Sequence, residues 1–141
     1  METQIKEANW GLRSVFYWIT WLIALGFIFI GIRFILQPQV GAFGYGIPFH
    51  NGHDITYGLT KGIRDIYSCL VLLPFLFMRM KRAAAWVFTL AIVISATDCL
   101  IILHTNGSRD IGHLLIHGLT ALMMIINSIM LFRINASVNK R

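Results

Sequence analysis

Hydrophobic residues are concentrated in four long stretches of the chain, separated by shorter segments that are rich in Gly, Pro, Asn or basic residues. A helix that spans a bilayer needs about 17–25 mostly apolar residues. The stretches that meet this length are residues 15–35, 55–78, 83–103 and 111–132. The pattern therefore predicts an all-α, polytopic membrane protein, a four-transmembrane-helix bundle that forms one domain over residues 1–141.

The overall composition agrees with this interpretation. The 141 residues are 57% hydrophobic and 13% charged, with a mean hydropathy of +0.69, which is too apolar for an ordinary soluble domain. The net charge of +6 is also compatible with nucleic-acid binding, but most of the basic residues lie at the ends of the chain or between apolar stretches, as is typical of membrane-protein loops. We therefore expect the lipid bilayer as a partner, and no nucleic acid.

The distribution of Lys and Arg predicts which side of the membrane the termini face. The connections at 37–54 and 104–110 contain a single basic residue, Arg109. The two terminal segments and the connection at 79–82 contain eight: Lys6, Arg13, Arg79, Lys81, Arg82, Arg133, Lys140 and Arg141. Because Lys and Arg are enriched in cytoplasmic segments, both termini are expected in the cytoplasm, in a multi-pass protein of the plasma membrane, of the bacterial inner-membrane type.

The first connection, residues 37–54, is unusually apolar for a loop. It has no Lys or Arg, but it contains glycines, prolines and the aromatic residues Phe43, Tyr45 and Phe49. We expect it either to cover the non-cytoplasmic end of the bundle as a lid or partly inserted cap, with these three aromatic residues at the membrane interface, or to form a plain interfacial loop.

Charged residues interrupt the second apolar stretch. Lys61, Arg64 and Asp65 share with Tyr57 one arc of a helix, so their side chains form a single stripe. An ionised residue in a bilayer costs about 2.5–3.5 kcal/mol on insertion scales, and such residues normally face the interior of a bundle. The stripe is therefore expected to meet polar groups from the other helices.

The other three stretches supply such groups at a similar depth. With the termini in the cytoplasm, a rise of about 1.5 Å per residue places them in the outer half of the membrane: Arg33, Asp98, His113 and His117. We expect Asp98 to pair with Arg64 or Lys61, and Arg33 to pair with Asp65. Three cations against two anions leave one positive charge in excess. Because an uncompensated buried charge is costly, the excess favours an anionic ligand, a lipid phosphate, water or deprotonation of Lys61.

These residues predict a pocket that binds a small lipophilic or anionic molecule and supports acid–base chemistry of the isomerase or cyclase kind. The candidate catalytic residues are Asp98 and His117, which would move protons, and Asp65, which would orient Arg33 or Arg64. The candidate ligand-binding residues, which would hold the polar end of the molecule, are Arg33, Lys61, Arg64, Tyr57 and His113.

No metal and no cofactor is expected. The sequence lacks a Cys/His cluster, an HExxH pattern and a phosphate-binding glycine loop, which are the usual signatures of such sites. The spacing of His113 and His117, at i and i+4, leaves metal or haem ligation as an alternative supported by nothing else in the chain.

Two other functions fit the same residues. A small homodimeric, proton-coupled transporter would use Asp65 or Asp98 and would need access from both sides of the membrane. A structural or accessory membrane subunit would pack against a partner through Gly58 and Gly62, whose spacing allows another helix to approach closely. Whether the protein is an enzyme is therefore open at this point.

Several short motifs resemble one family. They are Arg33, Pro38, Gly-Tyr-Gly-Ile-Pro at 44–48, Lys-Gly-Ile-Arg-Asp at 61–65, Asp98, and Gly107 followed by His117. Together they resemble the small bacterial and fungal membrane proteins catalogued as domain of unknown function 4267, over about 31–132, and the Lys-Gly-x-Arg-Asp element is the most specific of them. The resemblance implies a four-helix layout and an important charged cluster, and it implies no particular reaction.

Overall fold

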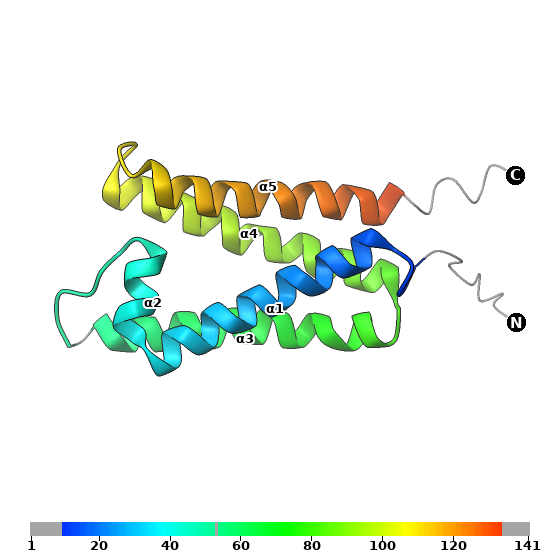
Figure 1. The fold of residues 1–141 in the computed structure, drawn as a ribbon, viewed down its shortest axis with the longest axis horizontal. Coiled ribbons are helices and arrows are strands. Elements are labelled where there is room, and N and C mark those ends of the chain that lie inside the picture. The colour runs from blue at the N-terminus through cyan, green and yellow to red at the C-terminus, as the bar shows by residue number, and fades with distance from the viewer. Residues whose placement is uncertain (1–9, 53, 134–141) are drawn as a thin grey trace, which may run out of the picture.

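The computed structural model describes residues 10–52 and 54–133. Three of the basic residues counted above, Lys6, Lys140 and Arg141, lie outside this range. The described chain forms five helices (Figure 1): α1 (Val15–Leu36), α2 (Pro38–Tyr45), α3 (Asp54–Phe77), α4 (Lys81–Asn106) and α5 (Ile111–Arg133).

The four long helices coincide with the four predicted stretches. α1, α4 and α5 are long and apolar enough to cross a membrane, whereas α3, which contains the charged stripe, is not one of these three. The largest difference in bounds is at α4, which begins before Ala83 and ends after Leu103, because hydropathy marks the apolar part of a helix and polar residues extend it at both ends. The chain is thus an all-helical, multi-pass membrane protein.

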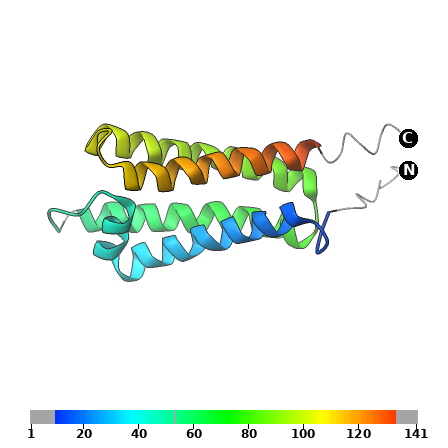
Figure 2. The same cartoon turned by 45° about the horizontal axis from the view of Figure 1, so that its top comes forward.

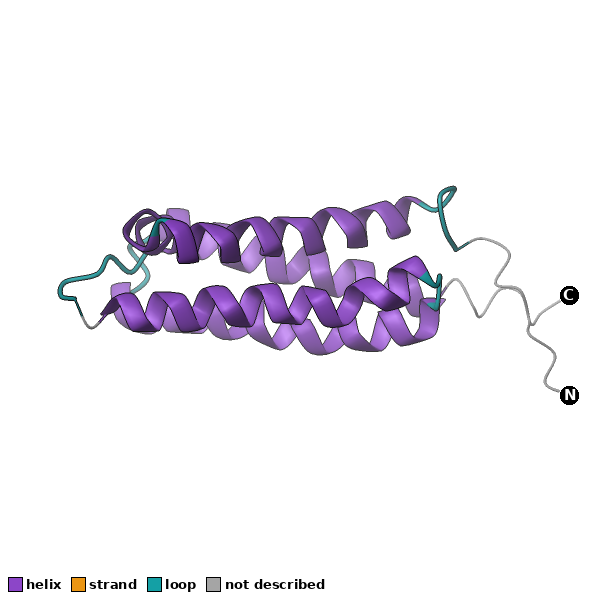
Figure 3. Cartoon of the chain, turned by 90° about the horizontal axis from the view of Figure 1, so that it is seen from below, coloured by secondary structure: helices purple, strands orange, loops and turns teal. Residues whose placement is uncertain are grey.

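The long helices pack as two antiparallel pairs. α1 lies along α3, and α4 lies along α5, as Figures 1 and 2 show, while α3 and α4 join the pairs. The first turn of α1 and the last turn of α5 lie at one end of the bundle, which we call the terminal end; α2 lies at the opposite end, which we call the α2 end (Figure 3).

A close approach of backbones brings α1 and α3 together. A Cβ atom added at Gly31 would lie 2.7 Å from the carbonyl oxygen of Gly62, and one added at Gly62 would lie 2.7 Å from the carbonyl oxygen of Gly31. A Cβ atom added at Gly58 would lie 2.5 Å from Cζ of the Phe49 ring. The expected close approach of another helix is therefore found at Gly62, where the helix is α1 of the same chain, while Gly58 is covered by Phe49.

The terminal half of the bundle has a filled apolar core. Side chains from all four long helices meet there, among them Tyr17, Leu76, Phe88, Met124 and Leu131. Two hydrogen bonds between polar side chains also cross this half: Asn127 donates to the Thr20 hydroxyl at 2.8 Å, and the hydroxyls of Thr89 and Ser128 pair with each other. The first of these bonds joins α1 to α5, and the second joins α4 to α5.

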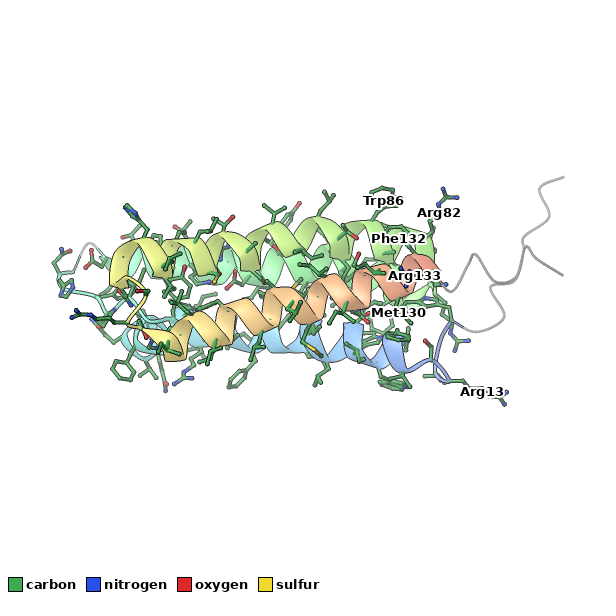
Figure 4. The ribbon with its side chains drawn as sticks, turned by 90° about the horizontal axis from the view of Figure 1, so that it is seen from above. Arg13, Arg82, Trp86, Met130, Phe132 and Arg133 are labelled. Carbon is green, nitrogen blue, oxygen red and sulfur yellow. The ribbon has the colours of Figure 1, made fainter. Side chains whose placement is uncertain are left out.

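The terminal end also has basic and aromatic residues. Figure 4 shows Arg82, Arg133, Trp86 and Phe132 on α4 and α5 at this end, with Arg13 just before α1. The rings of Trp86 and Phe132 meet edge to face with centroids 5.1 Å apart. Arg and Trp are the side chains that membrane proteins place at a membrane interface.

The first connection contains α2 rather than a plain loop. Pro38 begins this helix, where its missing N–H needs no partner, and Gly46 ends it in the left-handed conformation with φ of 101°. No helix was predicted here, because the glycines that allow α2 to lie close to its neighbours are also typical of loops. Tyr45, expected at the membrane interface, is instead buried.

Candidate functional site

Four charged side chains meet between α3 and α4. Lys61 Nζ donates to Asp65 Oδ2 and to Asp98 Oδ2, both at 3.0 Å. Arg64 Nη2 donates to Asp65 Oδ1 at 2.9 Å and to Asp98 Oδ2 at 3.1 Å. We call these four residues the ion network. The expected pairing of Asp98 with Lys61 or Arg64 is confirmed, since both cations reach it.

The position of each member follows from the helical period. Lys61 and Asp65 are one turn apart on α3, so both point into the bundle, where they are 5% and 1% exposed. Arg64 is adjacent to Asp65 and points elsewhere, but its long side chain turns back to the carboxylates and is 36% exposed. Asp98, from α4, is 3% exposed. Two cations and two anions balance, which is the condition under which buried charges are tolerated.

Tyr45 extends the ion network to α2 and α5. Its hydroxyl donates to Asp98 Oδ1 at 3.2 Å, and its ring lies 4.4 Å from Lys61 Nζ, a cation–π contact. His117 Nε2 lies 3.2 Å from the carbonyl oxygen of Tyr45, and the two rings meet edge to face at 5.0 Å. Sequence reasoning missed Tyr45 as a site residue; the available signal was an apolar connection able to fold back over the charged stripe.

A cavity of about 390 Å³ adjoins the ion network. It lies between α1 and α5 and is bounded by α2, in the part of the bundle where α1 diverges from α5 (Figure 1). Its wall on α1 is mostly apolar, whereas α5 contributes Ile116 together with the polar His117 and Thr120. The charged, hydroxyl or imidazole side chains that line it are Arg33, Tyr45, Lys61, Asp65, Ser95, Asp98, His117 and Thr120.

Five of the eight predicted site residues line this cavity: Arg33, Lys61, Asp65, Asp98 and His117. Arg64 belongs to the ion network but does not line the cavity, and Tyr57 is exposed on α3 away from it. Arg33 was expected to pair with Asp65, and this is wrong. Asp65 is bound by Lys61 and Arg64, while Arg33 is exposed at the edge of the cavity.

His113 contributes to a different contact, at the α2 end. Its Nδ1 lies 2.8 Å from Asp110 Oδ1, and Asn106 donates both to Asp110 and to the carbonyl oxygen of Gly46, the latter at 2.7 Å. The hydrogen bonds from Asn106 and then from His113 lower the pKa of Asp110 below its usual range. This contact ties α2 to the connection between α4 and α5, which helps to hold Tyr45 over the ion network.

The described residues contain no group of three or more His, Cys, Asp or Glu side chains able to hold a metal ion. His113 and His117 are directed to different partners, Asp110 and the Tyr45 carbonyl. Within the described residues, the two imidazoles therefore do not face one shared position for a metal ion.

Comparisons with curated proteins and with solved structures gave no match. A family model described as Domain of unknown function (DUF4267) matches residues 24–131. The match begins in α1 and ends in α5, and so includes the whole ion network and nearly all of the cavity lining. The chain belongs to the DUF4267 family.

Proposed function

We propose that this protein binds a small lipophilic molecule that enters the cavity sideways from the bilayer, between α1 and α5. The observation that carries the proposal is a cavity with apolar walls and a buried, polar floor. Its volume of about 390 Å³ falls within the range of roughly 300–1,000 Å³ of small-molecule sites. The apolar walls suit a hydrocarbon, and the floor supplies the few polar groups that orient a ligand.

In this proposal α3 is the fourth membrane span and the terminal end faces the cytoplasm. α3 has 24 residues, about as long as its neighbours, and it lies alongside them. Its charges are compensated within the bundle, which lowers the cost of placing them in a membrane. Arg13, Arg82 and Arg133 at the terminal end support a cytoplasmic location. The cavity then lies in the outer half of the membrane.

Exposed residues at the edge of the cavity support entry from the side. Leu22 on α1 is 72% exposed and Ile116 on α5 is 56% exposed, and both line the cavity. Toward the terminal end, Met124 and Phe88 belong to the apolar core, where the space that they line is only about 20 Å³. Access from one side supports binding or catalysis more than it supports the transporter alternative, which needs a path to both faces of the membrane.

The polar floor divides into a structural part and a free part. Asp98 accepts from Lys61, Arg64 and Tyr45, so we assign it the role of counter-ion. Asp65 is held in the same way by the two cations. His117 lines the cavity and, as a neutral ring donating Nε2–H to the Tyr45 carbonyl, keeps Nδ1 as an acceptor.

Within the proposal, acid–base chemistry therefore falls to His117. A neutral imidazole is able to take a proton from one atom of a bound molecule and return it to another. An isomerisation of this kind balances without a further reactant. The Asp98 and Asp65 roles expected from the sequence become those of charges that hold Lys61 and Tyr45 in place.

Photolabelling tests the binding site. A long-chain alcohol with a diazirine on its chain is mixed with the purified protein in phosphatidylcholine nanodiscs and irradiated, and labelled peptides are mapped by mass spectrometry. We expect label on the cavity-facing segments of α1 and α5. Label spread evenly over the lipid-facing helices would contradict the proposal.

A matched pair of glycine variants makes the test specific. Gly26 lines the cavity, Gly112 does not, and a Cβ at either would meet no atom within 4 Å. Gly26→Leu would place a side chain in the cavity and should reduce labelling several-fold, whereas Gly112→Leu should leave it unchanged. Equal labelling of both variants, with unchanged thermal stability, would place the probe elsewhere.

A further inference from the structure

The two cations that line the cavity differ in what they contact. The Lys61 ammonium already has partners within the chain: it donates to Asp65 and Asp98 and lies over the rings of Tyr45 and Phe34. Arg33 forms no ion pair among the described residues, and its side chain is directed toward Gly44 of α2, where a Cβ would lie 3.9 Å from Nη1. Arg33 is therefore the cavity cation available to a ligand.

The cavity continues from Arg33 as an apolar slot along α1. Ile30, Phe27, Gly26, Ile23 and Leu22 line it successively. Leu22 and Arg33 are eleven residues apart, which corresponds to about 16 Å along a helix. A cation at one end of an apolar helix wall is complementary to a molecule with an anionic head and one extended chain.

We propose that the ligand is a single-chain anionic amphiphile, with its carboxylate or phosphate on Arg33 and its chain along α1 toward Leu22. This inference depends on the proposed function, because it names the class of molecule that enters the cavity. A guanidinium binds either head group through two parallel hydrogen bonds. A volume of about 390 Å³, near the lower end of the roughly 300–1,000 Å³ range, favours one chain over two.

The direction of the slot supports this assignment. Arg33 lies in the last turn of α1, near the end of the span, and Leu22 lies closer to its middle. An amphiphile in the outer leaflet has its head at the interface and its chain toward the bilayer centre. It therefore enters between α1 and α5 without turning over and without moving its charge into hydrocarbon, which would be costly.

The same register places His117 and Lys61 beside the part of the ligand near its head. Gly31 of α1 contacts Gly62 of α3, so Lys61 lies at the depth of residues just below Arg33. A polar or unsaturated group a few carbons from the head would meet Lys61 and His117, whereas the far end of the chain would meet the apolar residues of α1 and the hydroxyl side chains of Ser95 and Thr120.

Competition against the photoprobe alcohol tests the head group. The competitors are dodecanoate, dodecyl phosphate and dodecanol, which share one chain, in phosphatidylcholine nanodiscs. We expect both anions to compete about tenfold better than dodecanol, as a charge-assisted pair should allow. Arg33→Gln should remove this preference, and Arg33→Lys should keep part of it. Preference for one anion alone would support the inference and narrow the head group.

Arg109→Gln is the matched control, because Arg109 is exposed in the connection between α4 and α5 and does not line the cavity. It should leave the preference unchanged; an equal loss would mean that general surface charge attracts the anions, and would overturn the inference. If dodecanol competes as well as the anions, the head-group assignment is wrong while the proposed function stands. If no competitor displaces the probe and the probe itself labels no cavity residue, the proposed function fails.

Discussion

Lys61 of α3 and Asp98 of α4 form a buried ion pair at 3.0 Å, and this pair separates the cavity from Arg64. Lys61 lines the cavity, whereas Arg64 binds Asp98 without lining it. The polar floor of the cavity is therefore also a principal contact between the α1–α3 pair and the α4–α5 pair. Binding and folding should be coupled at these residues.

Removal of the Asp98 charge should destabilise the fold. Asp98→Asn leaves the buried Lys61 and the partly exposed Arg64 with Asp65 alone, and breaking a buried pair such as Lys61–Asp98 costs about 3–5 kcal/mol. Thermal unfolding in detergent measures the effect, with Ser108→Ala, at an exposed position, as control. Adding Lys61→Met should recover part of the loss, because it removes the uncompensated charge. An unchanged midpoint for Asp98→Asn would show that the pair does not stabilise the bundle.

The α1–α3 contact should not tolerate a methyl group. A Cβ at Gly31 would lie 2.6 Å from Ile66 Cγ1 and 2.7 Å from the Gly62 carbonyl oxygen. Because one of these atoms belongs to the backbone, the helices must separate, and we expect Gly31→Ala to cost about 1–3 kcal/mol. Gly112→Ala, where a Cβ meets no atom within 4 Å, should be neutral or stabilising. Equal midpoints for the two variants would contradict the close contact.

The contact at the α2 end should depend on pH. The pKa of Asp110 is lowered by hydrogen bonds from Asn106 and His113. A carboxyl with a folded-state pKa below its unfolded value contributes stability above the unfolded value, and this contribution is lost as the pH falls through the folded value. The difference in unfolding midpoint between the protein and Asp110→Asn should therefore be present at neutral pH and shrink below the ordinary value of 3.8. A difference that stays constant down to this range would contradict the assignment.

Cysteine labelling should report the proposed topology. Cys69 and Cys99 are first replaced by Ala, and Arg109→Cys or Arg82→Cys is introduced. In intact cells, a membrane-impermeant maleimide should modify the cysteine at 109. It should modify the cysteine at 82 only after the cells are permeabilised, because four spans place these two connections on opposite sides of the membrane. Equal modification of both positions in intact cells would rule out this orientation.

Helix positions and the central ion pair could be predicted from the sequence because both depend on local rules. Apolar length predicts α1, α4 and α5, and the helical period puts Lys61 and Asp65 on one face of α3. Asp98 had to meet a cation from α3, since an unpaired charge in this setting is costly. The pairing of Arg33 with Asp65 failed because a charge count says nothing about which cation lies nearer.

The sequence alone thus determined a membrane protein with long helices and an ion pair between two of them, since hydrophobicity, helical period and the cost of buried charge can be read along the chain. The tertiary structure alone decided that α1 diverges from α5, that α2 brings Tyr45 onto Asp98, and that Arg33 stays free at the edge of the cavity. These features depend on the angle and the rotation at which the helices pack. Contacts between residues far apart in the sequence, such as that of Gly31 with Gly62, set both.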